Sequence, residues 1–134
     1  DGRKARDAIA KGIKPTDAVD IFVVGALADL DDPAFPLFGV HWRTTKQTSR
    51  RFIMLSSDAW GRTMAHELGH FFGLPHSTYA ISIMNKTPRL EPPLEQRRFS
   101  DEEVPILEAT RNKIEKRREL RNYHVPATAA PTTR

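Results

Sequence analysis

The residues best suited to chemistry are three histidines and a glutamate within positions 66–76, which read His-Glu-Leu-Gly-His-Phe-Phe-Gly-Leu-Pro-His. On a helix, His66 and His70 lie only about 40° apart around the axis, because four residues slightly exceed one turn. Their imidazole rings can therefore bind one ion from a single face, which makes H-E-x-x-H a zinc signature. Glu67 projects to one side of this face, within reach of a water on the metal but poorly placed to bind the metal itself.

The residues after the second histidine are suited to supply a third ligand. Gly73 can adopt a positive φ and end the helix. Leu74 and Pro75 then turn the chain back, so that His76 can provide another ring nitrogen. Three protein ligands leave the fourth position of zinc to water, which is typical of a catalytic rather than a closed structural site. A soluble helix with unrelated polar residues is the alternative, but it would have to reproduce every one of these spacings.

A methionine follows the motif within Ser82-Ile83-Met84-Asn85, eight residues after His76. Alone, Met84 would be interpreted as ordinary core packing. Taken together, the H-E-x-x-H-x-x-G-x-x-H pattern and this methionine resemble the metzincin clan of zinc endopeptidases, which have a Met-turn after the zinc motif. The sequence His76-Ser77-Thr78 and the short distance to Met84 are most similar to the matrixin branch.

The resemblance implies a function and a role for each motif residue. It implies one catalytic zinc ion held by His66, His70 and His76, with Glu67 as general base and then general acid in peptide-bond hydrolysis. Gly73 and Met84 would be structural, with Met84 beneath the metal and not ligating it. The expected partners are protein or peptide substrates, the expected state is a monomer, and the clan implies a secreted protein.

Three segments are predicted to be strands. Residues 19–25 are β-branched and almost entirely apolar, which is typical of an interior strand buried on both faces. Residues 51–56 form a second apolar strand, and residues 38–44 have the mixed polarity of an edge strand. In metzincins the edge strand runs antiparallel to the others and pairs with the substrate backbone, so the resemblance makes Gly39, Val40, His41 and Trp42 candidate substrate-binding residues. His41 could also be read as a metal ligand, although three histidines already complete the site.

Helices are predicted at residues 3–11, at residues 59–72, which carry the zinc motif, and from Ser100 to about Asn122. Ser57 or Asp58 is expected to cap the second helix, and Ser100 to Glu103 form a capping-box sequence for the third. The apolar residues off the metal face of the second helix are predicted to be core: Trp60, Met64, Leu68, Phe71 and Phe72. These elements are compatible with the α+β, zincin-like catalytic domain that the resemblance implies over residues 1–125, with a small mixed sheet and an N-terminal side thinner than in the clan. Residues 126–134 are expected to be a flexible tail.

Two segments are predicted to be irregular. Residues 29–36 are rich in turn residues, and their aspartates, Asp29, Asp31 and Asp32, could gather a calcium ion, although solvation explains acidic loop residues equally well. Residues 86–98 contain three prolines. In the clan this second region builds the wall of a specificity pocket on the primed side of the cleft.

The charge pattern bears on possible partners. The 134-residue chain has a formal net charge of +4 and a pI near 9.7, which raises the question of nucleic-acid binding. In the basic segment 111–121, however, Glu115 and Glu119 alternate with the cations, as on a solvated helix face, so we expect no nucleic-acid partner. No apolar run is long enough to span a membrane, and no membrane association is expected. The lack of cysteine excludes disulfides and thiolate zinc ligands.

Two other functions remain open. In a second branch of H-E-x-x-H enzymes a downstream glutamate is the third zinc ligand, and Glu91 or Glu95 could take that place; Gly73 and His76 would then be coincidences. Alternatively, the domain is not an enzyme and keeps the metal for stability, or uses the cleft to bind a protein. Zinc binding after replacement of His76 or Glu91 distinguishes the metzincin-like site from the site with a glutamate ligand. Turnover after replacement of Glu67 distinguishes an enzyme from a domain that only binds the metal or a protein.

Overall fold

The strand β5 (Arg51–Ser56) is the centre of a three-stranded sheet with the order β1-β5-β4. In the computed structural model, which describes residues 2–47 and 50–121, its apolar side chains are buried on both faces, and Phe52, Ile53 and Met54 are fully inaccessible. The strand β4 (Gly39–Arg43) pairs with it in antiparallel direction, and β1 (Ile21–Val24) pairs with it in parallel direction on the other side. The strand β5 coincides with the predicted range, and β4 is the antiparallel edge strand that was expected.

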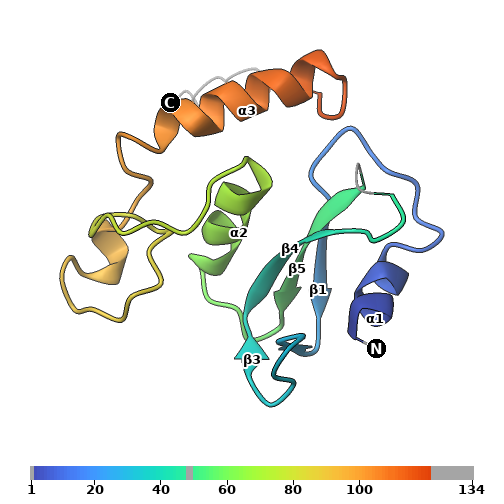
Figure 1. The fold of residues 1–134 in the computed structure, drawn as a ribbon, viewed down its shortest axis with the longest axis horizontal. Coiled ribbons are helices and arrows are strands. Elements are labelled where there is room, and N and C mark those ends of the chain that lie inside the picture. The colour runs from blue at the N-terminus through green and yellow to red at the C-terminus, as the bar shows by residue number, and fades with distance from the viewer. Residues whose placement is uncertain (1, 48–49, 122–134) are drawn as a thin grey trace, which may run out of the picture.

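Helices cover both faces of this sheet (Figure 1). Since successive side chains of a strand point to opposite faces, Phe52 and Met54 pack into one cluster beside α1 (Gly2–Ile9), together with Trp42. On the other face, Ile53 packs with Phe71 of α2 (Thr63–Phe71) and Ile114 of α3 (Val104–Lys116). The fold is therefore α+β, and α2 lies between β4 on one side and α3 on the other.

The strand β1 corrects the prediction that residues 19–25 lie in the sheet interior. Among the described residues no strand pairs with its outer side, and Val23 is 71% exposed. Phe22 and Val24, which point to the face beside α1, pack against the cluster there. The apolar character of these two alternate residues of β1 is therefore explained by burial. Apolar composition indicates burial but does not tell how many neighbours a strand has.

The helix α2 begins four residues later than predicted and is not capped by Ser57 or Asp58. The hydroxyl of Ser57 donates instead to the carbonyl of Gly25, which ties the turn after β5 to the end of β1. The residue preceding α2 is Arg62, and no side chain caps the helix there.

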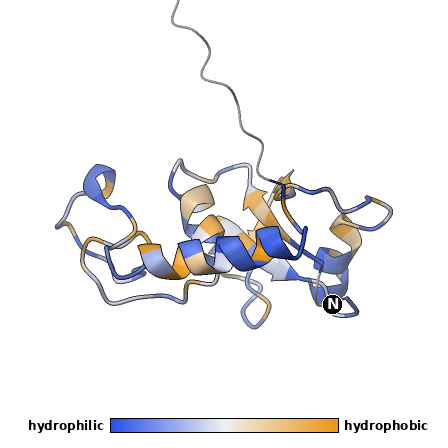
Figure 2. Cartoon of the chain, turned by 90° about the horizontal axis from the view of Figure 1, so that it is seen from above, coloured by the Kyte–Doolittle hydropathy of each residue, from blue (hydrophilic) through white to orange (hydrophobic). Residues whose placement is uncertain are grey.

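The helix α3 also differs from its predicted range of 100–122. One part of the capping box is present, because the Glu103 carboxylate accepts the N–H of Ser100 at 2.8 Å. The helix ends early because Arg118 adopts the left-handed conformation with φ 57°, and the N–H groups of Arg118 and Glu119 return to the carbonyls of Glu115 and Ile114. Figure 2 shows hydrophilic and apolar residues alternating along α3. On the surface of this helix, Arg111 Nε lies 3.9 Å from Glu115 Oε1.

Two short elements complete the described part. The hairpin of β2 (Leu27–Ala28) and β3 (Pro36–Leu37) encloses the acidic loop, in which Asp29 Oδ1 accepts the N–H groups of Asp31 and Asp32. The segment 86–98 is irregular apart from the 3-10 helix η1 (Leu94–Gln96). The predicted tail at 126–134 lies outside the described residues. Within the described ranges no helix has the length and apolar character needed to cross a bilayer.

Candidate metal centre

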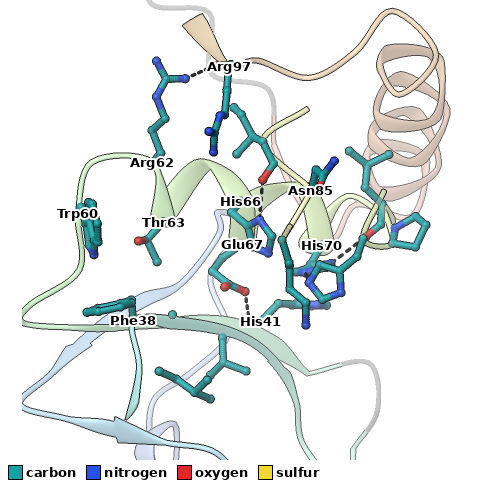
Figure 3. A pocket seen from close by; sticks show the side chains of 18 of the residues that line it. Phe38, His41, Trp60, Arg62, Thr63, His66, Glu67, His70, Asn85 and Arg97 are labelled. Carbon is teal, nitrogen blue, oxygen red and sulfur yellow. Dashed lines mark hydrogen bonds between the residues drawn. The ribbon is translucent and has the colours of Figure 1, made fainter. Parts of the chain in front are cut away.

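The structure brings the three motif histidines together at the end of α2, and Figure 3 shows two of them, His66 and His70, on that helix. His66 and His70 lie one turn apart on the helix, and Gly73, with φ 94°, ends the helix as predicted. The N–H groups of Gly73 and Leu74 return to the carbonyls of His70 and Gly69, which turns the chain and places His76 beside the helix. One possible ligand atom from each of His66, His70 and His76 lies within 4.8 Å of the other two.

Hydrogen bonds to backbone carbonyls orient two of these rings. The Nδ1 atom of His66 lies 2.9 Å from the carbonyl of Ile83, and that of His70 lies 2.8 Å from the carbonyl of Leu74. Because a carbonyl only accepts, Nδ1 must carry the proton in each ring, which leaves a lone pair on Nε2. This is the outer-shell arrangement that orients histidine ligands in metal sites.

The donor set fits a zinc ion. The Nε2 atoms of His70 and His76 are 3.1 Å apart. Two nitrogens bound to one tetrahedral zinc are roughly 3.3 Å apart, as follows from Zn–N distances of about 2.0–2.1 Å. Partial burial, together with the charge of Lys86, lowers the pKa of His76 to about 4, so that this ring is neutral at pH 7 and its nitrogen is free to bind. Neither Glu91 nor Glu95 belongs to the group, and both side chains are exposed.

Glu67 lies between α2 and β4, with its carboxylate held by the edge strand. Its Oε2 atom accepts the backbone N–H of His41 at 2.7 Å, while Oε1 makes no hydrogen bond within the described residues. The side chain is only 6% exposed, and burial raises the pKa of Glu67 above its ordinary value. A Cβ at Gly39 would lie 2.9 Å from Glu67 Cγ, so the absence of a side chain there lets strand and helix approach this closely. The outcome is a positioned carboxylate with one oxygen available as a base.

Met84 is fully buried and packs against α2. A Cβ at Gly69 would collide with Met84 Sδ, so the thioether packs against the helix backbone between His66 and His70. The N–H of Met84 donates to the Ser82 hydroxyl, which in turn donates to the Glu103 carboxylate at 2.7 Å. This network joins the turn at Met84 to the start of α3. Glu103 therefore has a second contact besides its predicted capping role, and no spacing in the sequence indicates this contact.

A cleft of about 1190 Å³ runs between α2, β4 and the irregular segment after Met84. It is lined by His66, Glu67, His70 and His76, and by most of the candidate substrate-binding residues, namely Gly39, Val40 and His41. Trp42 must be removed from that set. Its side chain points to the opposite face of the sheet, is 9% exposed, and donates through Nε1 to Asp7 at 2.8 Å.

The free edge of β4 faces the cleft. Phe38 and Thr44 bond to β5, so in this antiparallel pairing the alternate residues Gly39, His41 and Arg43 direct their backbone groups outwards. The N–H of His41 is already taken by Glu67. The remaining groups can pair with an extended peptide, which is the β-augmentation mode of recognition.

Trp60 corrects another prediction. It was expected in the core, but the helix begins only at Thr63, and Trp60 is 61% exposed at the cleft. Its ring meets that of Phe38 edge to face, with centroids 5.8 Å apart. Met64 is also largely exposed, whereas Leu68, Phe71 and Phe72 pack in the core as predicted.

His41 provides a prediction about stability. Its ring contacts Phe71 edge to face, with centroids 5.6 Å apart, and its Nε2 atom is buried without a hydrogen-bond partner in the described part of the chain. Burial, followed by the positive charges of Arg43 and Arg51, lowers the pKa of His41 to about 4. The ring is therefore neutral in the folded chain at pH 7.

On acidification the unfolded chain takes up this proton first, because the pKa of His41 in the folded chain lies below the ordinary 6.5. We expect the free energy of unfolding of the metal-free chain to lose a contribution of about 1–2 kcal/mol from His41 as the pH falls from 6.5 towards 4, after allowance for partial exposure. His41→Phe keeps the ring contact, cannot titrate, and should lack this loss. Denaturant unfolding of both proteins across this pH range measures the difference; parallel curves would contradict the assignment.

No family model, curated protein or solved structure matches the chain.

Proposed function

We propose that the chain is a zinc-dependent endopeptidase that hydrolyses peptide bonds in proteins or peptides. The observation that carries this proposal is the convergence of His66, His70 and His76 beside a buried glutamate, in a cleft bordered by a free strand edge. A metal site with three protein ligands keeps a position for water, and the strand edge suits an extended peptide. The resemblance of the motif to metzincins supports the same function.

Each residue has a chemical task in this proposal. His66, His70 and His76 would hold zinc, which when bound supplies a Lewis acid that polarises a peptide carbonyl and lowers the pKa of water. Glu67 would accept a proton from the attacking water at Oε1, because Oε2 is occupied by the N–H of His41. The raised pKa of Glu67 brings its basicity closer to neutral pH, where such a base is effective. Glu67 would then pass this proton to the leaving amine.

The alternative function is a zinc-binding domain without turnover. It is favoured by the small sheet, in which β1 is an open edge among the described strands. It is disfavoured by Glu67, because a buried carboxylate costs stability and a role in turnover would account for its presence. The alternative with a glutamate as third ligand receives no support from the positions of Glu91 and Glu95 outside the histidine group.

The test consists of two measurements on the purified chain: its metal content, and its cleavage of a denatured protein such as casein. We expect one zinc per chain, cleavage that stops when a chelator removes the metal, and recovery when zinc is restored. Zinc binding without any cleavage would favour the non-catalytic function. A chain that binds no zinc would contradict both.

A further inference from the structure

The cleft carries a strong excess of positive charge. It is lined by four cationic side chains, from Arg43, Arg62, Lys86 and Arg97, while Glu67 is the one acidic side chain that lines it among the described residues. None of the four cations forms an ion pair with a carboxylate within the described ranges. Zinc bound by three neutral histidines would add to this charge. Because a cleft with low-dielectric walls concentrates the field, it attracts anionic groups.

Two of these cations, Arg62 and Arg97, lie at one end of the cleft and are held in place by carbonyl groups. Arg62 donates to the backbone carbonyls of Arg97 and Glu95. Arg97 donates through Nε to the carbonyl of Pro92 at 2.9 Å and through Nη2 to that of Arg89 at 2.7 Å. These bonds orient the guanidinium groups without neutralising them. The Nη1 atom of Arg97 makes no hydrogen bond among the described residues.

The opposite wall at this end is aromatic. Figure 3 shows Arg97 reaching from its loop towards α2, beside Arg62, while Trp60, Thr63 and Phe38 lie on another side of the same cleft. Phe38 is 43% exposed, so the aromatic pair it forms with Trp60 presents free surface to the cleft. Such a wall can cover the methylene groups of a side chain whose charged end reaches the arginines, and it strengthens that charge interaction by excluding water.

The direction of β4 tells which part of a substrate reaches this end. Gly39, the first residue of β4, lies against Thr63, whereas Arg43 lies at the far end of the strand. A peptide that adds to β4 in antiparallel direction, as β5 does on the other side, therefore runs towards Phe38 after it has passed the histidines and Glu67. Residues that follow the cleaved bond would lie at the end with Arg62 and Arg97.

We infer that the cleft selects peptides with an acidic side chain immediately after the cleaved bond, and that Arg97, supported by Arg62, binds its carboxylate. This inference rests on the proposed peptidase function and adds a substrate class to it. The Nη1 atom of Arg97, which makes no hydrogen bond among the described residues, can donate to a carboxylate, and the bond is charge-assisted. An amide of the same shape loses that charge, and a lysine at the same place is repelled.

The test uses sets of peptides that differ only in Glu, Gln or Lys after the cleaved bond. We expect kcat/KM for Glu to exceed that for Gln by about tenfold, as for a hydrogen bond to a charged group, and the ratio to shrink at high salt. Arg97→Gln should bring the ratio close to one, whereas Arg97→Lys, which keeps the charge, should restore part of it. Arg98→Gln is the matched control, because Arg98 is exposed and does not line the cleft.

A binding measurement separates this inference from the peptidase function. Trp60 is exposed at the cleft whereas Trp42 is buried, so tryptophan fluorescence reports binding of the same peptides to the zinc-loaded Glu67→Gln protein. Glu-selective binding without turnover in the wild type would leave the selection standing and reject the peptidase. Equal rates or equal binding for Glu and Gln peptides in the wild type would overturn the inference, even if Arg97→Gln fails to fold. The inference would also be overturned if a stable Arg97→Gln protein kept the wild-type ratio of kcat/KM between Glu and Gln peptides. A preference for Glu only before the cleaved bond would overturn it as well.

Discussion

Glu67→Gln is expected to lower the rate of peptide cleavage by a factor of about 10²–10⁴ while one zinc per chain remains bound. The amide keeps the shape of the side chain, and its oxygen can still accept the N–H of His41 that Glu67 Oε2 accepts at 2.7 Å. It cannot take a proton from water at pH 7. Because the loss is confined to proton transfer, kcat should fall much more than the affinity for substrate.

The same substitution that lowers activity is not expected to lower stability. Burial raises the pKa of Glu67, so the charged carboxylate is less favourable in the folded chain than in the unfolded chain at pH 7. The free energy of unfolding of metal-free Glu67→Gln should therefore equal or exceed that of the metal-free wild type. Such a gain is expected where a residue is kept for activity at a cost in stability. Glu95→Gln, at an exposed position outside the cleft, is the matched control. It should change neither the rate of cleavage nor the free energy of unfolding. Cleavage that survives in Glu67→Gln at the wild-type rate would reject Glu67 as the base.

The parts of this structure that the sequence predicts are those set by short-range spacing. The positions of His66 and His70 on one helix face, the end of that helix at Gly73 and the return of the chain to His76 all depend on residues within one or two turns of each other. The apolar run of β5 is long enough to be recognised as a strand without knowledge of its neighbours. The polarity of β4 is enough to place it at the edge of the sheet.

The predictions that failed depend on how distant segments meet. The apolar pattern of residues 19–25 would suit an interior strand, but β1 has a partner on one side alone among the described strands. Trp60 was assigned to a helix face, yet it precedes α2 and turns into the cleft. The left-handed conformation of Arg118 ends α3 at a residue type that rarely adopts it, so no glycine or asparagine announces this end.

The residues missed at the site come from the irregular segments. Arg97 reaches the cleft through hydrogen bonds to carbonyls of its own loop, and Glu103 reaches the turn at Met84 through Ser82. Neither contact has a periodic pattern in the sequence. The one available signal is the resemblance of the histidine motif to metzincins, which would imply that the segment 86–98, with its charged side chains, borders a specificity pocket.

His76→Ala is expected to reduce zinc affinity by more than the roughly ten- to hundredfold that the loss of an outer-shell partner costs, because it removes one of three ligands. His76 is exposed and belongs to neither core cluster, so the metal-free variant should unfold like the metal-free wild type. The difference should appear only when zinc is added. Zinc that binds only the folded chain stabilises it by about 4 kcal/mol at a thousand times its Kd, and this gain should largely disappear in the variant.

Thermal unfolding with and without zinc measures this gain in the wild type, in His76→Ala and in the matched variants Glu91→Ala and Glu95→Ala. Both glutamates are exposed and lie outside the histidine group, so their variants should keep the full zinc-dependent rise in Tm. A loss of that rise in Glu91→Ala or Glu95→Ala, with His76→Ala unaffected, would assign the third ligand to a carboxylate. The turn at Gly73 would then have no role in metal binding. The measurement decides this without turnover, because it reads the stability that bound metal adds to the fold.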